Sequence, residues 1–170
     1  APEEIGGCVL VNTSLRPFSP FFHRLRPRNY AALLRLALRP RSAEAIERTV
    51  WRLTSNAPDP RNAVIGAWVA ARTRHPVSPI NALRQLVAAA RYRAPTVAPN
   101  PRILLLTSQS DQLVDSRCSL AIARSWHCAL AVHPQAGHDL PLDAPQWVIE
   151  QVQQWLAHTA PSQRAPATDP

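Results

Sequence analysis

The chain has 170 residues, which is enough to bury a hydrophobic core, and one domain is the default expectation. Its formal net charge is +8, but all 19 basic residues are Arg, and they are scattered rather than alternating with stacking aromatics. Without a binding motif this charge concerns solubility and non-specific attraction, so a dedicated nucleic-acid binder ranks last, and no apolar run is long enough for a membrane span.

The first predicted element lies close to the start of the sequence. Residues 7–13 form a continuous apolar run that ends in polar residues, which is typical of a strand buried on both faces of a parallel sheet. The sequence contains no Met. We therefore expect it to be a piece of a longer protein, whose targeting information, if any, would lie upstream.

A long helical segment is predicted between the first and second strands. A loop interrupted by Pro17, Pro20 and Pro27 comes first. Asn29 is the expected N-cap of a helix over Tyr30–Leu38. A helix capped by Ser42 follows, in which Ile46, Val50 and Leu53 share one face, and then a helix near Asn62–Arg74.

The fourth helix of this segment has the clearest predicted start, with Ser78 as N-cap and Pro79 in the first helical position. Its apolar residues form one stripe (Ile80, Leu83, Val87, Ala90). Residues 94–101, which contain three prolines, are expected to be an extended connector into the second strand.

The last third of the chain alternates strand and helix. We expect strands over Ile103–Thr107 and Cys128–Val132, separated by a helix that starts at Asp115 or Ser116 and ends at about Trp126. This alternation predicts an α/β fold with a parallel sheet. Three strands are few for such a sheet, which also suggests that earlier strands are missing.

A final helix is expected to begin near Pro145, with Asp143 as its N-cap. Its buried face should consist of Val148, Val152, Trp155 and Leu156. The tail over residues 159–170 has no apolar periodicity, and we expect it to be disordered.

Two residue types suited to acid–base chemistry follow neighbouring strands. Asp111 lies four residues after Thr107, and His138 lies six residues after Val132. Functional residues of open α/β sheets gather at the carboxyl ends of the strands. A carboxylate there can accept the Nδ1 proton of an imidazole and leave Nε2 free to take a proton from a nucleophile. Gly137 would allow the backbone to turn so that the ring points over the strand ends.

Structural roles are the alternative for each residue taken alone. Asp111 could form a turn, and His138 could be a solvated loop histidine. The rival acid is Asp115, which better suits capping, while Asp139 and Asp143 are interpreted as supporting and capping residues. The remaining histidines have no partner loop with an acid and are interpreted as structural or surface groups (His23, His75, His127, His133, His158).

At these positions the chain resembles the α/β-hydrolase family. Ser108-x-x-Asp111-x-Leu-Val is similar to the family's loop with the triad acid, although Ser108 stands where Gly is common, and Gly137-His138 is similar to its triad histidine. The start, residues 5–14, resembles the strand after the nucleophile helix. The resemblance implies residues 1–14 as a core strand, 15–98 as a helical lid, 99–158 as the C-terminal core and 159–170 as a tail.

The family's nucleophile is not recognisable. It sits in a Gly-x-Ser-x-Gly elbow before the acid and the histidine, and the amide after it contributes to the oxyanion hole. None of the four glycines here (Gly6, Gly7, Gly66, Gly137) frames a Ser. The resemblance therefore implies the C-terminal portion of a serine hydrolase, with Asp111 and His138 as catalytic residues and a nucleophile outside this sequence. The chain alone is expected to be inactive.

The implied substrate is a small ester or related acyl compound. Cys8, Cys118 and Cys128 show no metal-ligand spacing, so no metal or cofactor is expected. They are interpreted as free thiols in a reducing compartment, which favours the cytoplasm. The alternative is a non-catalytic, truncated hydrolase whose helical segment binds a partner.

Overall fold

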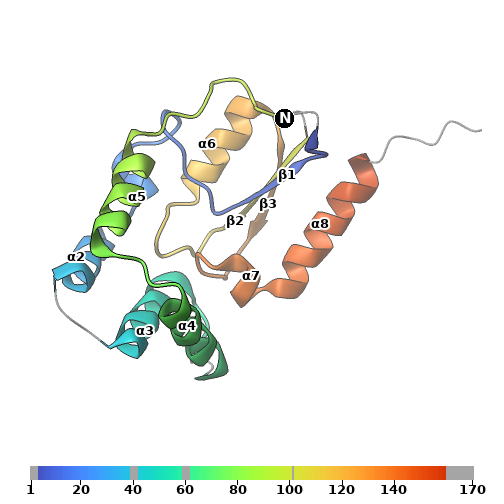
Figure 1. The fold of residues 1–170 in the computed structure, drawn as a ribbon. Coiled ribbons are helices and arrows are strands. Elements are labelled where there is room, and N and C mark those ends of the chain that lie inside the picture. Colours follow the sequence, from blue (N-terminus) through green and yellow to red (C-terminus); the bar gives the residue numbers. More distant parts are fainter. Residues whose placement is uncertain (1–3, 39–41, 59–61, 101, 160–170) are drawn as a thin grey trace, which may run out of the picture.

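The structure is a computed structural model that describes residues 4–38, 42–58, 62–100 and 102–159. Its centre is a parallel sheet of the strands β1 (Cys8–Val11), β2 (Ile103–Ser108) and β3 (Ala129–His133), in the order β1-β2-β3 (Figure 1). All three predicted strands are confirmed, and none of their ends shifts by more than two residues. The α/β fold class with flanking helices is confirmed as well.

The hydrophobic core lies on both faces of β2. Successive side chains of a strand point to opposite faces, so Ile103 and Leu105 pack on one side and Leu104 and Leu106 on the other. Helix α6 (Arg117–Trp126) covers the first side, and α7 (Leu140–Asp143) and α8 (Pro145–Thr159) cover the second (Figure 1).

Burial on both faces was expected for all three strands, and this is wrong for the outer two. Val9 of β1 is 36% exposed and Val132 of β3 is 45% exposed, whereas every residue of β2 is buried. The outer strands each have one neighbour among the described strands, and packing covers them only in part.

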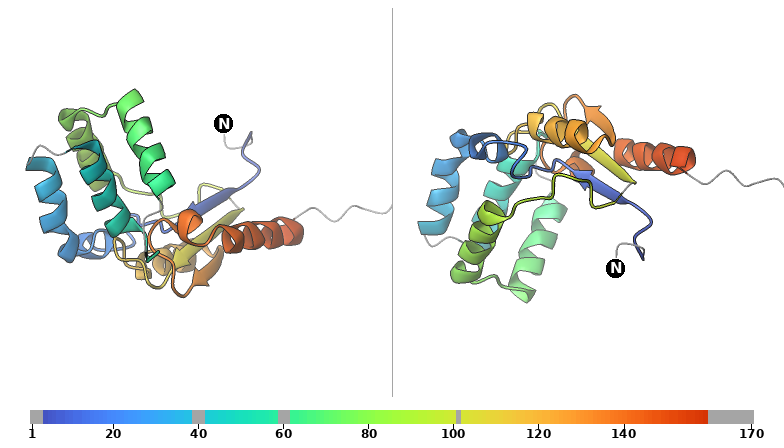
Figure 2. Two further views of the ribbon diagram at one scale, coloured as in Figure 1. Left: turned by 90° about the horizontal axis from the view of Figure 1, so that it is seen from below. Right: turned by 90° about the horizontal axis from the view of Figure 1, so that it is seen from above.

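Between β1 and β2 the chain forms a set of helices that we call the helical insert. It comprises α1 (Phe21–Arg24), the 3₁₀ helix η2 (Pro27–Asn29), α2 (Tyr30–Leu38), α3 (Ala43–Thr54), α4 (Asn62–Arg74) and α5 (Pro79–Arg91). These helices group together beside the sheet, whereas α8 extends from its other side (Figure 2). The assignment of the insert as a lid stays a prediction.

Two of the three predicted caps in the insert are confirmed. The Ser42 hydroxyl accepts from the Ala45 amide at 3.2 Å, and the Ser78 hydroxyl accepts from the Asn81 amide at 3.3 Å. Asn29 does not cap α2, because it lies within η2 and its side-chain amide donates to the Gln112 carbonyl at 2.8 Å. Here a contact distant in sequence replaces the expected local one.

Helix α5 carries its apolar stripe without a covering partner. No residue of α5 is buried, and Leu83 is 55% exposed. The insert therefore presents apolar surface among the residues that the structure describes.

The C-terminal elements differ from expectation at three points. Asp143 does not cap α8, because it ends α7 and its carboxylate bonds elsewhere. Leu156 is 48% exposed, whereas Val148, Val152 and Trp155 pack on the core as predicted. Helix α8 runs through Thr159, the first residue of the predicted tail, and the rest of that tail lies outside the described residues. Over the parts of the chain described, no helix combines the length and apolarity of a membrane span.

Candidate active site

Asp111 lies in the loop after β2, and its side chain is held in one orientation. Its Oδ1 accepts from the backbone amides of Leu113 at 2.7 Å and Val114 at 3.0 Å. The residue is 1% exposed. A buried carboxylate needs such donors to compensate for lost hydration. These two bonds occupy Oδ1 and leave Oδ2 to face a different partner.

That partner is His138. Its Nδ1 lies 2.8 Å from Asp111 Oδ2, so the two side chains meet as the strand-end positions led us to expect. The carboxylate fixes the tautomer with the proton on Nδ1, which leaves Nε2 as an acceptor. The His138 side chain is 29% exposed, so its ring can be reached from outside. The arrangement is suited to general-base chemistry, and the catalytic roles of both residues stay predictions.

Asp115, the rival acid, has other partners. Its carboxylate binds Arg117, with Nη2 to Oδ2 at 2.8 Å, and lies 3.7 Å from Arg26. It also accepts from the Arg117 backbone amide at the start of α6. The hydrogen bond from the Arg117 side chain, with the charge of Arg26, holds the pKa of the Asp115 carboxyl well below its usual range. Asp115 therefore supports the start of α6.

This ion pair predicts a pH dependence of stability. The pKa of the Asp115 carboxyl is lower in the folded chain than its ordinary value of 3.8, which we take for the unfolded chain. Its contribution to the free energy of unfolding is therefore fully present above pH 3.8 and is lost as the pH falls below that value. We expect the urea midpoint to fall less between about pH 6 and about pH 3 in Asp115→Asn than in the unaltered chain. An equal fall of the urea midpoint in the two proteins would contradict this expectation.

Asn12, which no sequence pattern singled out, directly follows β1 and is 3% exposed. Its side-chain amide donates to the carbonyls of His138 at 2.7 Å and Gly137 at 3.2 Å. Its Oδ1 accepts from the Ser108 amide at 2.7 Å. Asn12 thus connects the ends of β1 and β2 to the His138 loop. The one sequence feature that could have pointed to Asn12 is its place at the end of a strand. Asn tolerates the left-handed backbone that this position adopts, with a φ of 45°.

Gly137 has a different role from the one expected. No glycine among the described residues has a positive φ, so the turn does not require one here. Instead, a Cβ at this position would lie 2.5 Å from the Thr54 carbonyl oxygen and 2.9 Å from Asp143 Oδ2. Glycine is needed because the end of α3 approaches the His138 loop closely.

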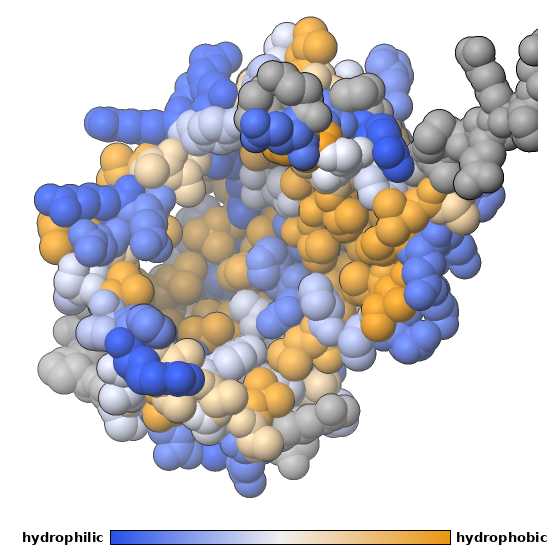
Figure 3. Space-filling view, turned by 45° about the vertical axis from the view of Figure 1, so that its right-hand side comes forward, coloured by the Kyte–Doolittle hydropathy of each residue, from blue (hydrophilic) through white to orange (hydrophobic). Residues whose placement is uncertain are grey.

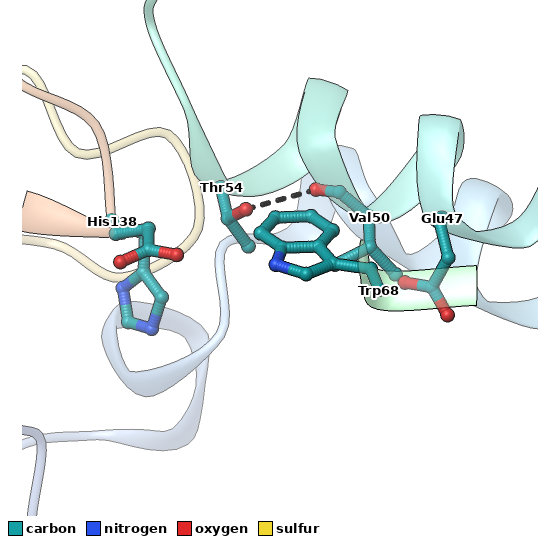
Figure 4. Close-up of a pocket in the computed structure, with 6 residues that line it drawn as sticks. Glu47, Val50, Thr54, Trp68 and His138 are labelled. Carbon is teal, nitrogen blue, oxygen red and sulfur yellow. Dashed lines mark hydrogen bonds between the residues drawn. The ribbon is translucent and has the colours of Figure 1, made fainter. Parts of the chain in front are cut away.

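A pocket of about 340 Å³ opens beside His138. Its walls come from α3 and α4, with Val50, Thr54 and Trp68 between His138 at one end and Glu47 at the other (Figure 4). The ring of Trp51 packs against that of Trp68, with 5.9 Å between the ring centroids. Glu47 forms an ion pair with Arg72. Asp139, which follows His138 in sequence, also lines the pocket, so the pocket combines apolar and aromatic side chains with two carboxylates.

No hydroxyl or thiol in the part of the chain that the structure describes is hydrogen-bonded to Nε2 of His138. The only hydrogen bond of the His138 ring there is the one to Asp111. The nearby hydroxyls of Ser108 and Ser110 donate to backbone carbonyls. Burial raises the pKa of the Cys118 thiol, which disfavours the thiolate that a cysteine nucleophile needs.

Comparison with solved structures identifies the fold. The chain is similar to 2-hydroxy-6-oxo-6-phenylhexa-2,4-dienoate hydrolase from a Rhodococcus species, with 18% identity and a TM-score of 0.64, over 92% of this chain and 57% of that one. It also resembles a thermophilic esterase from Thermogutta terrifontis, with 20% identity and a TM-score of 0.61, over 92% of this chain and 57% of that one. A hydrolase from Pseudomonas aeruginosa is 19% identical to this chain, with a TM-score of 0.63, over 92% of this chain and 57% of that one.

These matches show that the chain has a partial α/β-hydrolase fold, which spans little more than half the length of the structures it matches. No protein-family model and no curated protein sequence matches it. At this level of identity the likeness concerns the fold alone, and function must be argued from the site.

Proposed function

We propose that Asp111 and His138 are the acid and the base of a serine-hydrolase active site that cleaves carboxylic esters or related acyl compounds. The 2.8 Å bond between Asp111 Oδ2 and His138 Nδ1 carries the proposal, because it fixes the tautomer in which Nε2 can accept a proton. The fold of the hydrolases and esterases similar to this chain supports it.

The nucleophile, in this proposal, is a serine on a segment outside these residues. The outer edge of β1 has no partner among the described strands and is open to another parallel strand. The carboxyl end of such a strand would lie at the same edge of the sheet as the loops of Asn12, Asp111 and His138. The same segment would supply at least one oxyanion-hole amide, a donor worth roughly 3–4 kcal/mol of transition-state stabilisation.

The pocket beside His138 suits a small acyl or alcohol group. Val50, Thr54 and Trp68 offer apolar and aromatic contacts over about 340 Å³, a volume at the lower end of the range for small-molecule sites. We therefore propose short esters as the first substrates to test. The three cysteines are free thiols, which supports a reducing compartment and our proposal of a cytoplasmic location.

The test uses a longer form of the chain that includes the reading frame upstream of Ala1. We expect a Gly-x-Ser-x-Gly sequence there and hydrolysis of p-nitrophenyl acetate or butyrate. Replacing the base, in His138→Ala, should lower kcat by at least about 10³-fold. The matched control is His158→Ala, which changes an exposed histidine of α8 that bonds its own helix. An active longer form whose kcat survives His138→Ala would refute the proposal.

A second candidate function, binding without turnover, is favoured by the apolar surface of the insert. A groove of about 790 Å³ lies between α1, α2 and α5, lined largely by apolar and aromatic side chains such as Phe21, Leu25, Leu86 and Tyr92. One face of the molecule is hollowed, and hydrophobic residues gather in and beside the hollow (Figure 3). An upstream frame without an elbow serine, and a longer form without esterase activity, would favour this function.

A further inference from the structure

The end of α3 contacts the backbone on both sides of His138. On one side, the Asp139 amide donates to the Thr54 carbonyl at 2.8 Å. On the other side, the Gly137 amide donates to Asp143 Oδ2 at 2.6 Å, and Asp143 is itself bonded to the residues after Thr54. The two residues that flank His138 in sequence are thus held by one short segment of the helical insert and one carboxylate.

Asp143 is the centre of this arrangement, which we call the α3 junction (Thr54, Ser55, Asn56, Gly137 and Asp143). Its Oδ1 accepts from the Ser55 hydroxyl at 2.5 Å, and its Oδ2 accepts from the Asn56 amide at 2.8 Å in addition to that of Gly137. Hydrogen bonds to an ionised carboxylate are roughly twice as strong as neutral ones. The junction therefore fixes the relative position of α3 and the His138 loop.

Asn56 extends the contact to the loop of the acid. Its side-chain amide donates to the carbonyl of Ser110, the residue before Asp111, at 3.0 Å. It also donates to the carbonyl of Gln135, on the approach to His138, at 2.9 Å. One side chain of the insert thus bridges the two loops that carry Asp111 and His138. These bonds are exposed to water, so we expect each to contribute less than the bonds of Asp143.

From these contacts we propose that Asp143 is a positioning residue, which acts through the α3 junction to hold the imidazole of His138 against Asp111. The helical insert then contributes to the geometry of the acid–base pair as well as to the pocket wall. The value of the pair for catalysis rests on the proposed function, but the positioning itself does not.

The test measures the His138–Asp111 hydrogen bond directly in the 170-residue chain, without any nucleophile. The probe is the low-field proton resonance of His138 Nδ1 in NMR spectra, assigned through its loss in His138→Ala. In Asp143→Ala we expect this resonance to be lost or broadened beyond detection, while the chain stays folded. In Asp143→Asn, which keeps one acceptor oxygen, the resonance should weaken less. The matched control is Glu150→Gln, which neutralises an exposed carboxylate of α8 whose one described contact is Gln146.

If Asp143→Ala does not fold, Ser55→Ala and Asn56→Ala each remove one component of the junction and decide the question in the same way. A folded Asp143→Ala chain with an unchanged Nδ1 resonance would overturn the proposal, as would unchanged spectra of both smaller variants. An altered resonance together with an inactive longer form would leave the positioning role standing and count against the hydrolase function alone.

Discussion

Replacing Asn12 by Ala should destabilise the fold by about 4 kcal/mol, a large effect for a polar residue next to a strand. The change leaves the Ser108 amide and the His138 carbonyl without the partners that they have at 2.7 Å. An unsatisfied buried polar group costs about 1–3 kcal/mol. Alanine in the left-handed region, at the φ of 45° found here, adds about 1–2 kcal/mol. Urea unfolding followed by circular dichroism measures the loss.

Asn12→Gly separates the two causes. Glycine adopts a positive φ without steric cost, so this variant should recover about 1 kcal/mol relative to Asn12→Ala, while the lost hydrogen bonds remain. An exposed asparagine, changed in Asn81→Ala, should have a small effect. If Asn12→Ala lost less than about 1 kcal/mol, the role assigned to its side-chain amide would be wrong.

Local patterns were sufficient to predict the strands and most of the helices. The run Ile103–Ser108 is apolar and becomes the buried central strand, and Ser42 and Ser78 mark helix starts because their hydroxyls satisfy nearby amides. The meeting of Asp111 and His138 also followed from local reasoning, since both come just after strands that run in the same direction.

Contacts that depend on distant partners were not predictable in this way. Asn29 and Asp143 both sit before helices and have the side chains of N-caps, yet each bonds to a distant segment instead. Leu83 is exposed because none of the described segments covers the apolar stripe of α5, and the periodicity of the helix alone does not reveal whether a partner covers it. Asn12 and the α3 junction join segments far apart in sequence, so their importance emerges only when the strand-end loops and α3 come together.

If a longer form has the proposed esterase activity, Asp111→Asn should lower its kcat by about 10⁴-fold with little effect on stability. The reason lies in the two amides that donate to Asp111 Oδ1, those of Leu113 and Val114. They require an oxygen at that position, so the new side-chain NH₂ must occupy the place of Oδ2 and face His138 Nδ1. The imidazole then accepts at Nδ1 and carries its proton on Nε2, where it can no longer act as a base.

Asp115→Asn is the matched control, because it makes the same change in the other acid of this region, which contacts Arg26 and Arg117 instead of His138. Its kcat should stay within about threefold of the unaltered value. Nitrogen-15 chemical shifts of the His138 ring in the 170-residue chain report the tautomer independently of turnover, and they should change only in Asp111→Asn. A switched tautomer with unchanged kcat would exclude His138 as the base, whereas an unswitched tautomer would show that the two backbone amides do not fix the side chain. The orientation of one carboxylate by its own loop thus determines which nitrogen of the imidazole is free to accept a proton.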